Sequence, residues 1–380
     1  MKKRQLTPLA LAVGLALISQ VGLAKEQTGA VIKNNMSFTD TADTYTARDT
    51  YTETVQGVNG KTLTITFNDL TLVNNSTNQL SSVINADTGT LTFTGDKLTL
   101  NKEVALTQAG YGNQSFISNK KPTTSAPVGT LTFDTAVSMG GSVPYGIYLQ
   151  GTATFKQGYD MEIDRTGQTG ALDVAGVLFQ SGGSLTTDQP TSMTVTASAN
   201  DKKLQGIVLT LNGNKSLTNF QGIVDATNQT GKADMTVDGP LSITMKTGHE
   251  ARALDFRGKR NYVIGGDTTI NISDVVTVYG LKTTGNVDFQ GNVNMTLGAT
   301  GDSWGIHAYR HETAQATDPA ANVTLKKAVI KFTGDDKTVD QTAIYLQDKA
   351  QLEAESLETN AKQALMADGG SSIRVKGDLI

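Results

Sequence analysis

The chain repeats one short phrase: a glycine, an alternating run of small apolar and threonine residues ending in phenylalanine, a turn, and a second alternating run. The clear copies are GTLTFTGDKLTL at 89–100, GTLTFDTAVSM at 129–139, GTATFKQGYDMEI at 151–163 and GNVDFQGNVNMTL at 285–297, with looser copies at 231–245 and 321–332. Self-similarity of this kind predicts a stacked repeat protein, in which each copy buries its apolar side against the next.

Alternation within the phrase predicts half-buried strands, because successive side chains of a strand point to opposite faces. In the copy at 285–297, Val287 and Phe289 are expected inside, and Asp288 outside. The run at 61–67 alternates apolar residues with threonine in the same way. Threonine suits such positions because its branched Cβ packs well on a pleated surface.

A second element lies between the copies, and a small residue opens a short strand in each case. It reads YGIYLQG at 145–151, AGVLFQSG at 175–182, QGIVLTLNG at 206–214, YGLKTTG at 279–285, WGIHAY at 304–309 and TAIYLQ at 342–347. Each repeat therefore holds about three short strands separated by turns, with anchors roughly every 20 to 50 residues.

Two all-β architectures fit these strands: an antiparallel sandwich or barrel, and a parallel β-helix. The copies match like for like, phenylalanine over phenylalanine and threonine over threonine, which favours parallel stacking in register. We expect a right-handed parallel β-helix over 56–380 with about a dozen coils. The segment at 349–367 is expected to form two strands rather than a helix. The phenylalanines expected in the core are Phe93, Phe133, Phe155 and Phe289.

Residues 1–24 are predicted to be a cleavable secretory signal peptide. Lys2, Lys3 and Arg4 form a basic start, an apolar run follows at 9–18, and small residues precede a cleavage site after Ala24. A membrane anchor is the weaker interpretation, because the apolar run is too short to span a bilayer comfortably.

The 380 residues include no cysteine, although an exported chain could use disulfides. A long solenoid core needs no disulfides, and a chain that crosses a second membrane unfolded would be obstructed by one. The sequence does not decide between these two explanations.

The net charge is −4, and basic residues form no blocks along the chain, which argues against nucleic-acid binding. Residues 25–55 are expected to form a lead-in that caps the first coil. Segments 112–128 and 310–320 are expected to leave the stack as loops.

The signal peptide, the absence of cysteine, the GTLTF-type repeats and the YGIYLQ-type anchors resemble the passenger domain of a bacterial autotransporter of type V secretion. The resemblance covers about 56–380 and implies a pertactin-like right-handed parallel β-helix that is often an adhesin. In that family a C-terminal outer-membrane β-barrel carries the passenger out, and no such barrel follows here. The phrase at 371–380 stops inside a coil, which predicts a truncated passenger.

Several motifs could suggest chemistry, and none is assigned a catalytic, cofactor-binding or metal role. GDSWG at 301–305 resembles the GDSGG signature of serine proteases, but Trp304 replaces a glycine and the segment matches the coil anchors. The three histidines are His249, His307 and His311. His307 and His311 lie four apart, yet on a strand followed by a loop that spacing does not form a metal site.

The acidic residues also form no recognisable site in the sequence. Asp335, Asp336 and Asp340 lack the spacing of a calcium loop, and a solvated turn is expected. A β-helical lyase or hydrolase would need carboxylates and basic residues clustered on one outward ladder. The outward acids Glu162, Asp234 and Asp288 fall in separate coils. Lys376-Gly377-Asp378 is treated as a chance integrin-type tripeptide.

Aromatic residues cluster near the anchors. They are Tyr145, Tyr148, Tyr279, Trp304, Tyr309 and Tyr345. Such rings could hold sugars or protein partners on one face. The favoured interpretation is that they close coil corners and fill the ends of the core.

The function expected from these features is surface display or adhesion by an exported, non-enzymatic passenger that needs no cofactor. Its expected partners are the Sec export machinery and a host-surface protein or glycan. Its expected location is the cell surface or the medium as part of a full-length autotransporter, and the periplasm if this chain acts alone. The alternatives are a β-helical carbohydrate-active enzyme and a truncated passenger without independent function.

Overall fold

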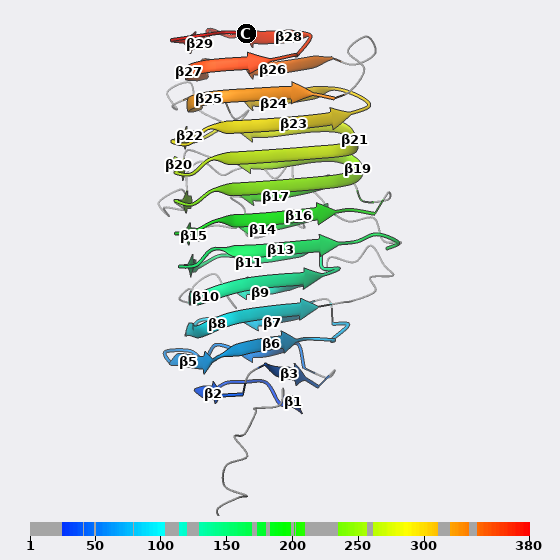
Figure 1. Ribbon diagram of the computed structural model, residues 1–380, viewed down its shortest axis with the longest axis vertical. Coiled ribbons are helices and arrows are strands. Elements are labelled where there is room, and N and C mark those ends of the chain that lie inside the picture. The colour runs from blue at the N-terminus through cyan, green and yellow to red at the C-terminus, as the bar shows by residue number, and fades with distance from the viewer. Residues whose placement is uncertain are drawn as a thin grey trace, which may run out of the picture.

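The computed structural model describes residues 25–40, 42–48, 51–78, 80–102, 114–119, 129–168, 173–179, 183–198, 201, 203–209, 235–256, 261–310, 320–333 and 340–380. The predicted signal peptide lies outside these residues. Within them the secondary structure consists of 29 strands joined in one sheet, and no helix is present. The strands stack into a tall column of coils (Figure 1).

Each coil contributes to three ladders of parallel strands, which confirms the predicted parallel β-helix. Ladder one contains β2 (Met36–Phe38), β5 (Thr62–Phe67), β8 (Thr90–Lys102), β10 (Thr130–Gly141), β12 (Thr152–Phe155), β15 (Ser184–Thr187), β18 (Met235–Val237), β20 (Asn261–Ile264), β22 (Asn286–Phe289), β25 (Asn322–Phe332), β27 (Gln351–Thr359) and β29 (Ser372–Val375).

Ladder two takes the second halves of the long strands β8, β10, β25 and β27 and adds strands of its own. These are β1 (Glu26–Gly29), β3 (Asp43–Ala47), β6 (Asp69–Val73), β13 (Tyr159–Asp164), β16 (Thr191–Thr196), β19 (Leu241–Phe256), β21 (Thr268–Thr283) and β23 (Val293–Ala299).

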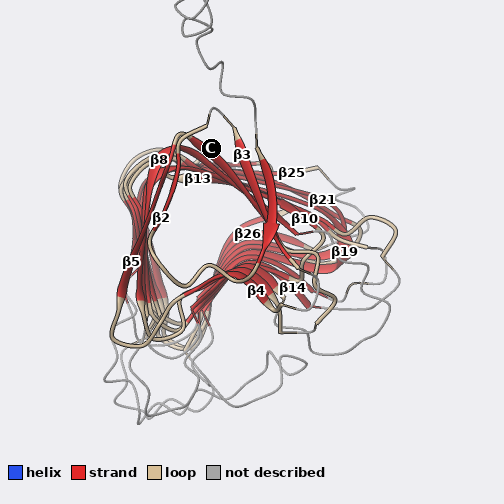
Figure 2. Ribbon diagram, turned by 90° about the horizontal axis from the view of Figure 1, so that it is seen from below, coloured by secondary structure: helices blue, strands red, loops and turns tan. Residues whose placement is uncertain are grey.

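Ladder three contains the anchor phrases and shares β19 and β21 with ladder two. Its other strands are β4 (Glu53–Gln56), β7 (Ser82–Asn85), β9 (Ser115–Asn119), β11 (Tyr145–Leu149), β14 (Asp173–Phe179), β17 (Lys203–Leu209), β24 (Ser303–Ala308), β26 (Gln341–Leu346) and β28 (Gln363–Ala367). Figure 2 looks up the column from its N-terminal end. The chain passes clockwise from ladder one through ladders two and three as it recedes, so the β-helix is right-handed.

The predicted register is confirmed along ladder one. Phe93 pairs with Phe133, and Phe133 pairs with Phe155. Their rings stack at centroid distances of 5.1 and 4.5 Å, and each is fully buried. Phe289, higher in the column, is 1% exposed. The alternating threonines face outward, so the phrase encodes both the core and the surface of one ladder.

Two segments differ in detail from the sequence-based expectation. The predicted loop at 112–128 is wrong at 115–119, because Ser115–Asn119 forms β9 and pairs with β7 and β11. The polar residues of the surrounding segment hid Phe116 and Ile117, both of which are fully buried. The lead-in at 25–55 is itself built of strands, and β1, β3 and β4 already pair in parallel. The two strands expected in 349–367 are β27 and β28.

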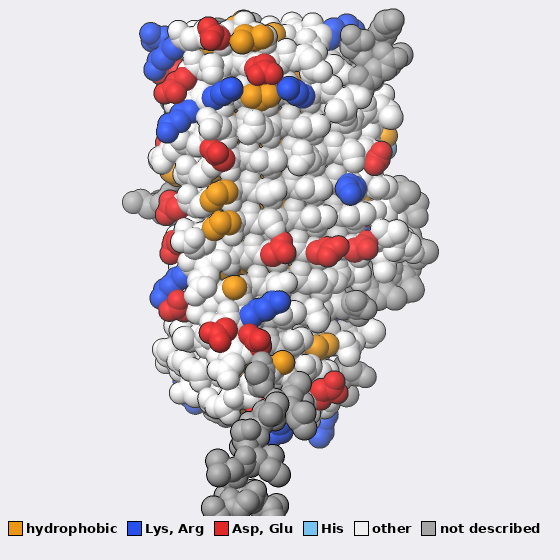
Figure 3. Space-filling model, in the orientation of Figure 1, with side chains coloured by type: hydrophobic (Ala, Val, Ile, Leu, Met, Phe, Trp, Pro, Cys, Tyr) orange, Lys and Arg blue, Asp and Glu red, His pale blue; other side chains and the backbone are white. Residues whose placement is uncertain are grey.

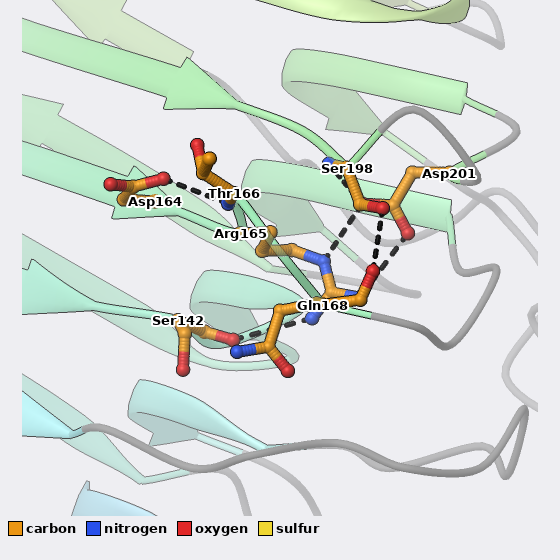
Figure 4. Close-up of polar contacts among 7 residues, drawn as sticks. All are labelled: Ser142, Asp164, Arg165, Thr166, Gln168, Ser198 and Asp201. Carbon is orange, nitrogen blue, oxygen red and sulfur yellow. Dashed lines mark hydrogen bonds and ion pairs between the residues drawn. The ribbon is translucent and has the colours of Figure 1, made fainter.

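Polar side chains are buried where ladder two turns into ladder three. Arg165 and Asp201 are fully buried and joined by two hydrogen bonds of 3.0 and 3.2 Å (Figure 4). Arg165 also donates to the Ser142 carbonyl oxygen at 3.3 Å, and the Ser198 amide donates to Asp201 at 2.9 Å. A buried ion pair needs such extra partners to offset its desolvation. The cluster therefore ties neighbouring coils together at this corner.

Lys102 is a second buried charge at the same corner, in a lower coil. Its ammonium donates to Asn74 Oδ1 at 2.7 Å and to the Ser76 carbonyl oxygen at 3.2 Å. Burial lowers the pKa of the Lys102 amine to about 7. The next coil passes over it at Gly141, where an added Cβ would lie 2.0 Å from the Lys102 carbonyl oxygen. Only glycine allows this close approach with φ at +147°.

The outer face of ladder two is mostly uncharged (Figure 3). Figure 3, with ladder two toward the viewer, shows a mostly uncharged surface on which acidic and basic side chains are scattered. This agrees with outward positions filled by threonine, serine and asparagine. The outer face of ladder three has a different composition.

Candidate binding surface

The outer face of ladder three carries a cluster of half-buried aromatic rings over β21, β24 and β26. We call Tyr279, Trp304, His307, Tyr309 and Tyr345 the aromatic surface. The residues that alternate with them, such as Leu281, Ile306 and Ile344, are fully buried in the core. Strand alternation therefore places these rings on the side of the sheet opposite to the core.

The rings stack from coil to coil because the strands pair in register. Tyr279 pairs with Trp304, and their rings lie 4.6 Å apart and 10° from parallel. His307 pairs with Tyr345, and these rings lie 5.0 Å apart and 12° from parallel. Tyr309 lies 5.0 Å from the His307 ring at a larger tilt of 31°. In the Tyr279–Trp304 and His307–Tyr345 pairs, the ring faces are therefore turned toward each other along the axis of the β-helix.

A glycine follows both Tyr279 and Trp304 in the chain and lets the coils approach closely at this ladder. A Cβ on Gly280 would lie 2.7 Å from the Gly305 carbonyl oxygen, and one on Gly305 would lie 2.5 Å from the Ala343 carbonyl oxygen. The coils can approach only because these positions lack a side chain. The Tyr-Gly and Trp-Gly anchors of the sequence therefore have a steric cause.

Two cations lie against the lower end of the aromatic surface. The Lys282 ammonium is 4.6 Å from the Tyr279 ring centroid and 5.6 Å from that of Tyr309. The Arg252 guanidinium is 5.5 Å from the Tyr279 centroid. Ring faces attract cations, and the attraction grows as the site loses water. Burial and the nearby Glu250 raise the pKa of Tyr279 to about 12, so its hydroxyl stays protonated.

Arg252 is also held by two carboxylates. It forms ion pairs with Glu250 and with Asp255, the latter at 2.7 Å. Asp255 is fully buried, and Arg252 is 7% exposed. The guanidinium charge is therefore largely satisfied within the protein.

His307 lies at the centre of the aromatic surface and is neutral at ordinary pH. Burial, reinforced by Lys282 and Arg252, lowers its pKa to about 4. Its Nε2 lies 2.9 Å from Gln347 Oε1, so Nε2 carries the hydrogen and donates it. Its Nδ1 is buried and has no hydrogen-bond partner. The hydrogen bond from Nε2 to Oε1 fixes the orientation of the Gln347 amide.

A column of polar groups borders the rings. Tyr309, Gln347 and Asp368 follow the ends of β24, β26 and β28, and their amides continue the ladder by donating to carbonyl oxygens of the coil below. The Tyr345 hydroxyl donates to Asp368 Oδ2 at 3.0 Å. Burial and this carboxylate raise the pKa of Tyr345. A hydroxyl, an amide and a carboxylate thus occupy successive coils beside the rings.

The candidate protease motif is a coil anchor. Ser303 is 2% exposed, and its hydroxyl donates to the Gly301 carbonyl oxygen at 3.2 Å. His307, four residues further along β24, is hydrogen-bonded to Gln347. His249 is exposed, and His311 lies outside the described residues. Ser303 is thus held by the backbone within its own turn.

The candidate acidic positions that the structure describes do not come together. Glu162 is on ladder two and Asp288 on ladder one, while Asp234, Asp335 and Asp336 lie outside the described residues. Asp340 pairs with Lys362 at 3.4 Å. Lys376, in the tripeptide near the C-terminus, pairs with Glu353. In the described part of the chain, no group of three His, Asp or Glu side chains could hold a metal.

The favoured interpretation of the aromatic residues is wrong for Tyr279, Trp304, Tyr309 and Tyr345. The five rings of the aromatic surface lie outside the core rather than filling its ends. Tyr145 and Tyr148 are buried, but they form a separate cluster with Ala175 and Leu178 instead of joining the main core. Sequence reasoning also missed Arg252, Lys282, Gln347 and Asp368. These residues become neighbours of the rings only through pairing between coils.

The architecture defines the chain as a right-handed parallel β-helix protein. No family model matches the chain, and neither the curated proteins nor the solved structures contain a match. Among the residues that the structure describes, no helix has the length and apolar character needed to span a membrane.

Proposed function

We propose that this chain is an exported β-helical passenger of the autotransporter type and that it serves surface display or adhesion. The observation that carries the proposal is the aromatic surface, a set of rings outside the core on a rigid ladder. At protein interfaces a few residues supply most of the binding energy, and tyrosine, tryptophan and arginine are enriched among them. Rings already fixed by stacking lose little conformational entropy when a partner binds.

Export rests on the sequence of residues 1–24 and on the resemblance to autotransporter passengers. We propose Sec-dependent transfer to the periplasm, and display on the surface as part of a protein that includes an outer-membrane barrel. Expression in a Gram-negative host followed by fractionation tests the first step. We expect a periplasmic product whose mass lacks residues 1–24. A cytoplasmic product that retains this segment would contradict export.

Adhesion is tested with the purified chain on cultured epithelial cells and on immobilised matrix proteins and glycans. We expect saturable binding that is lost in Trp304→Ala/Tyr345→Ala. Tyr51→Ala is the matched control, because Tyr51 is also half-buried but lies near β4, at the other end of the column. Equal binding by the double variant and the control would place the binding site elsewhere. Absence of binding to any of these surfaces would contradict adhesion.

A carbohydrate-active enzyme is the second candidate, and one observation favours it. Glu250, Arg252 and Asp255 lie together on an outward ladder, as such an enzyme would require. The binding function is preferred because Asp255 is fully buried and both carboxylates are held by Arg252. Incubation with neutral and uronate-containing polysaccharides, followed by assays for new reducing ends and unsaturated products, separates the two. Product formation that disappears in Glu250→Gln would establish the enzyme.

A further inference from the structure

The polar column of Tyr309, Gln347 and Asp368 indicates which chemistry the aromatic surface recognises. Since His307 donates to Gln347 Oε1, the two N–H donors of this amide are turned away from the imidazole. Asp368 accepts from the Tyr345 hydroxyl through Oδ2 and keeps acceptor capacity on Oδ1. The Tyr309 hydroxyl can both donate and accept. A ligand that accepts from the Gln347 amide and donates to Asp368 matches both of these groups.

The ring arrangement determines how such a ligand is held. Tyr279 stacks on Trp304, and His307 stacks on Tyr345, so these rings turn faces toward each other and edges toward solvent. Ring edges are electropositive and favour oxygen acceptors, whereas a cation or a flat sugar face would need a free ring face. Hydrogen bonds to hydroxyl oxygens therefore dominate over stacking on a single ring.

Charge at the site argues against a polyanionic ligand. Asp368 belongs to the polar column, and Asp302 and Asp348 are close enough to act on Tyr279 and Tyr345 respectively. The nearby cations are held within the protein: Arg252 pairs with Glu250 and Asp255, and the Lys282 ammonium lies over the Tyr279 and Tyr309 rings. Acidic glycans and nucleic acids would meet these carboxylates, and like charges brought together at an interface oppose binding. An uncharged ligand meets no such repulsion.

The repeat of the ladder points to an extended ligand. Equivalent groups recur on successive coils about 4.8 Å apart along a straight axis. A chain of similar units that runs parallel to the axis can contact Tyr309, Gln347 and Asp368 in turn. We propose that the aromatic surface binds a neutral, extended oligosaccharide laid along the helix axis, with its hydroxyls bonded to this column. The inference rests on the proposed binding function and specifies its ligand.

The test measures binding of the full chain to immobilised neutral oligosaccharides built from glucose, galactose, mannose or N-acetylglucosamine. Each series increases in length, and uronate-bearing and sulfated counterparts are included. We expect at least one neutral series to bind, with affinity that rises with length and exceeds that of its acidic counterparts. Gln347→Ala and Asp368→Ala should each weaken binding about tenfold, because each removes a hydrogen bond to the ligand.

Gln290→Ala is the control, since Gln290 is an exposed amide after β22 on ladder one and should leave binding unchanged. Gln347→Glu preserves side-chain size and removes the N–H donors, so a loss there is not explained by misfolding. Thermal unfolding checks each variant. Binding only to acidic series, equal affinity for single sugars and long chains, or unchanged binding by Gln347→Glu would each overturn the inference.

Failure of this inference is distinguishable from failure of the proposed function. Adhesion to cells or matrix that depends on Trp304 and Tyr345, without binding to any neutral oligosaccharide, would overturn the glycan ligand and leave adhesion standing. A protein partner would then be the ligand class. Loss of both kinds of binding in the wild-type chain would contradict both proposals.

Discussion

At the scale of single residues, the contrast between Phe155 and Thr154 tests the assignment of inner and outer positions. Phe155 is fully buried and stacks on Phe133, whereas Thr154 faces outward. We expect Phe155→Asp to lower the free energy of unfolding by more than about 3 kcal/mol, because it places an unpaired charge in the core. Thr154→Ser should cost less than about 1 kcal/mol. Urea unfolding measures both, and equal costs would contradict the assignment.

The buried Lys102 amine should make the folded protein more stable as the pH rises above 7. Its pKa is about 7 in the folded protein and 10.5 in an ordinary setting. Between these values the unfolded chain binds one more proton than the folded chain. The free energy of unfolding should therefore rise with pH by up to ~1.4 kcal/mol per unit.

The measurement for Lys102 compares urea unfolding at pH 7 and pH 9 in the wild type and in Lys102→Met. We expect the wild type to gain more stability with rising pH than the variant, which lacks the amine. Since the other titrating groups are common to both proteins, the difference isolates Lys102. Identical pH dependence in the two proteins would show that the amine is not perturbed by burial.

At the scale of elements, the corner between ladders two and three depends on the Arg165–Asp201 pair. Arg165→Ala leaves Asp201 buried without its cation and should cost about 3–5 kcal/mol. Arg165→Met/Asp201→Leu removes both charges, and we expect it to recover most of that loss, because well-packed apolar residues often replace a buried ion pair without cost. Thermal unfolding of the three proteins is the measurement. A double variant no more stable than Arg165→Ala would mean that the pair has no favourable apolar substitute.

The aromatic surface has its own pH dependence through His307. Its pKa is about 4 in the fold and 6.5 in an ordinary setting. As pH falls from about 6.5 to 4, the unfolded chain takes up a proton that the folded chain resists. Stability should therefore fall over this window by up to ~1.4 kcal/mol per unit. His307→Phe keeps a stacked ring without a titrating group, and urea midpoints at pH 7 and pH 4.5 should differ less in this variant. An unchanged difference would be evidence against a buried imidazole.

Strand alternation was enough to predict most of the fold. The positions of Phe93, Phe155 and Phe289, the parallel ladders and the strand pair at 349–367 all followed from period-two patterns and like-for-like copies. The segment around Ile117 did not, because two apolar residues, Phe116 and Ile117, within a long polar stretch are a weak signal. Its place in ladder three comes from pairing with the coils on either side.

The candidate site could be predicted only in part. The sequence showed that aromatic residues gather near the anchors, but not on which side of the sheet they lie. Tyrosine and tryptophan suit both a coil corner and a half-wet surface, so composition did not decide between them. The neighbours Lys282, Gln347 and Asp368 come from different coils, and coil lengths vary too much along this chain for their register to be counted from the sequence.

At the scale of the whole molecule, the residues that stabilise the β-helix are different from those that we propose bind a partner. The core and the buried corner residues hold the coils together, while the outer face of ladder three presents rings and polar groups at fixed intervals. Such a quasi-one-dimensional stack can offer a long, straight surface without a deep pocket. This division explains why one face can be specialised while the face in Figure 3 remains mostly uncharged.

Hydroxyl-radical footprinting of the chain bound to the cell or matrix surface is the most direct test that this face is the binding surface. Trp304, Tyr345 and Met366, which follows Tyr345 in the same ladder and is 38% exposed, are reactive reporters. Leu80, at 59% exposed, and Tyr51 are references far from the site. We predict that binding protects the three reporters and leaves the references unchanged. Protection of the references with unchanged reactivity at Trp304 and Tyr345 would contradict it.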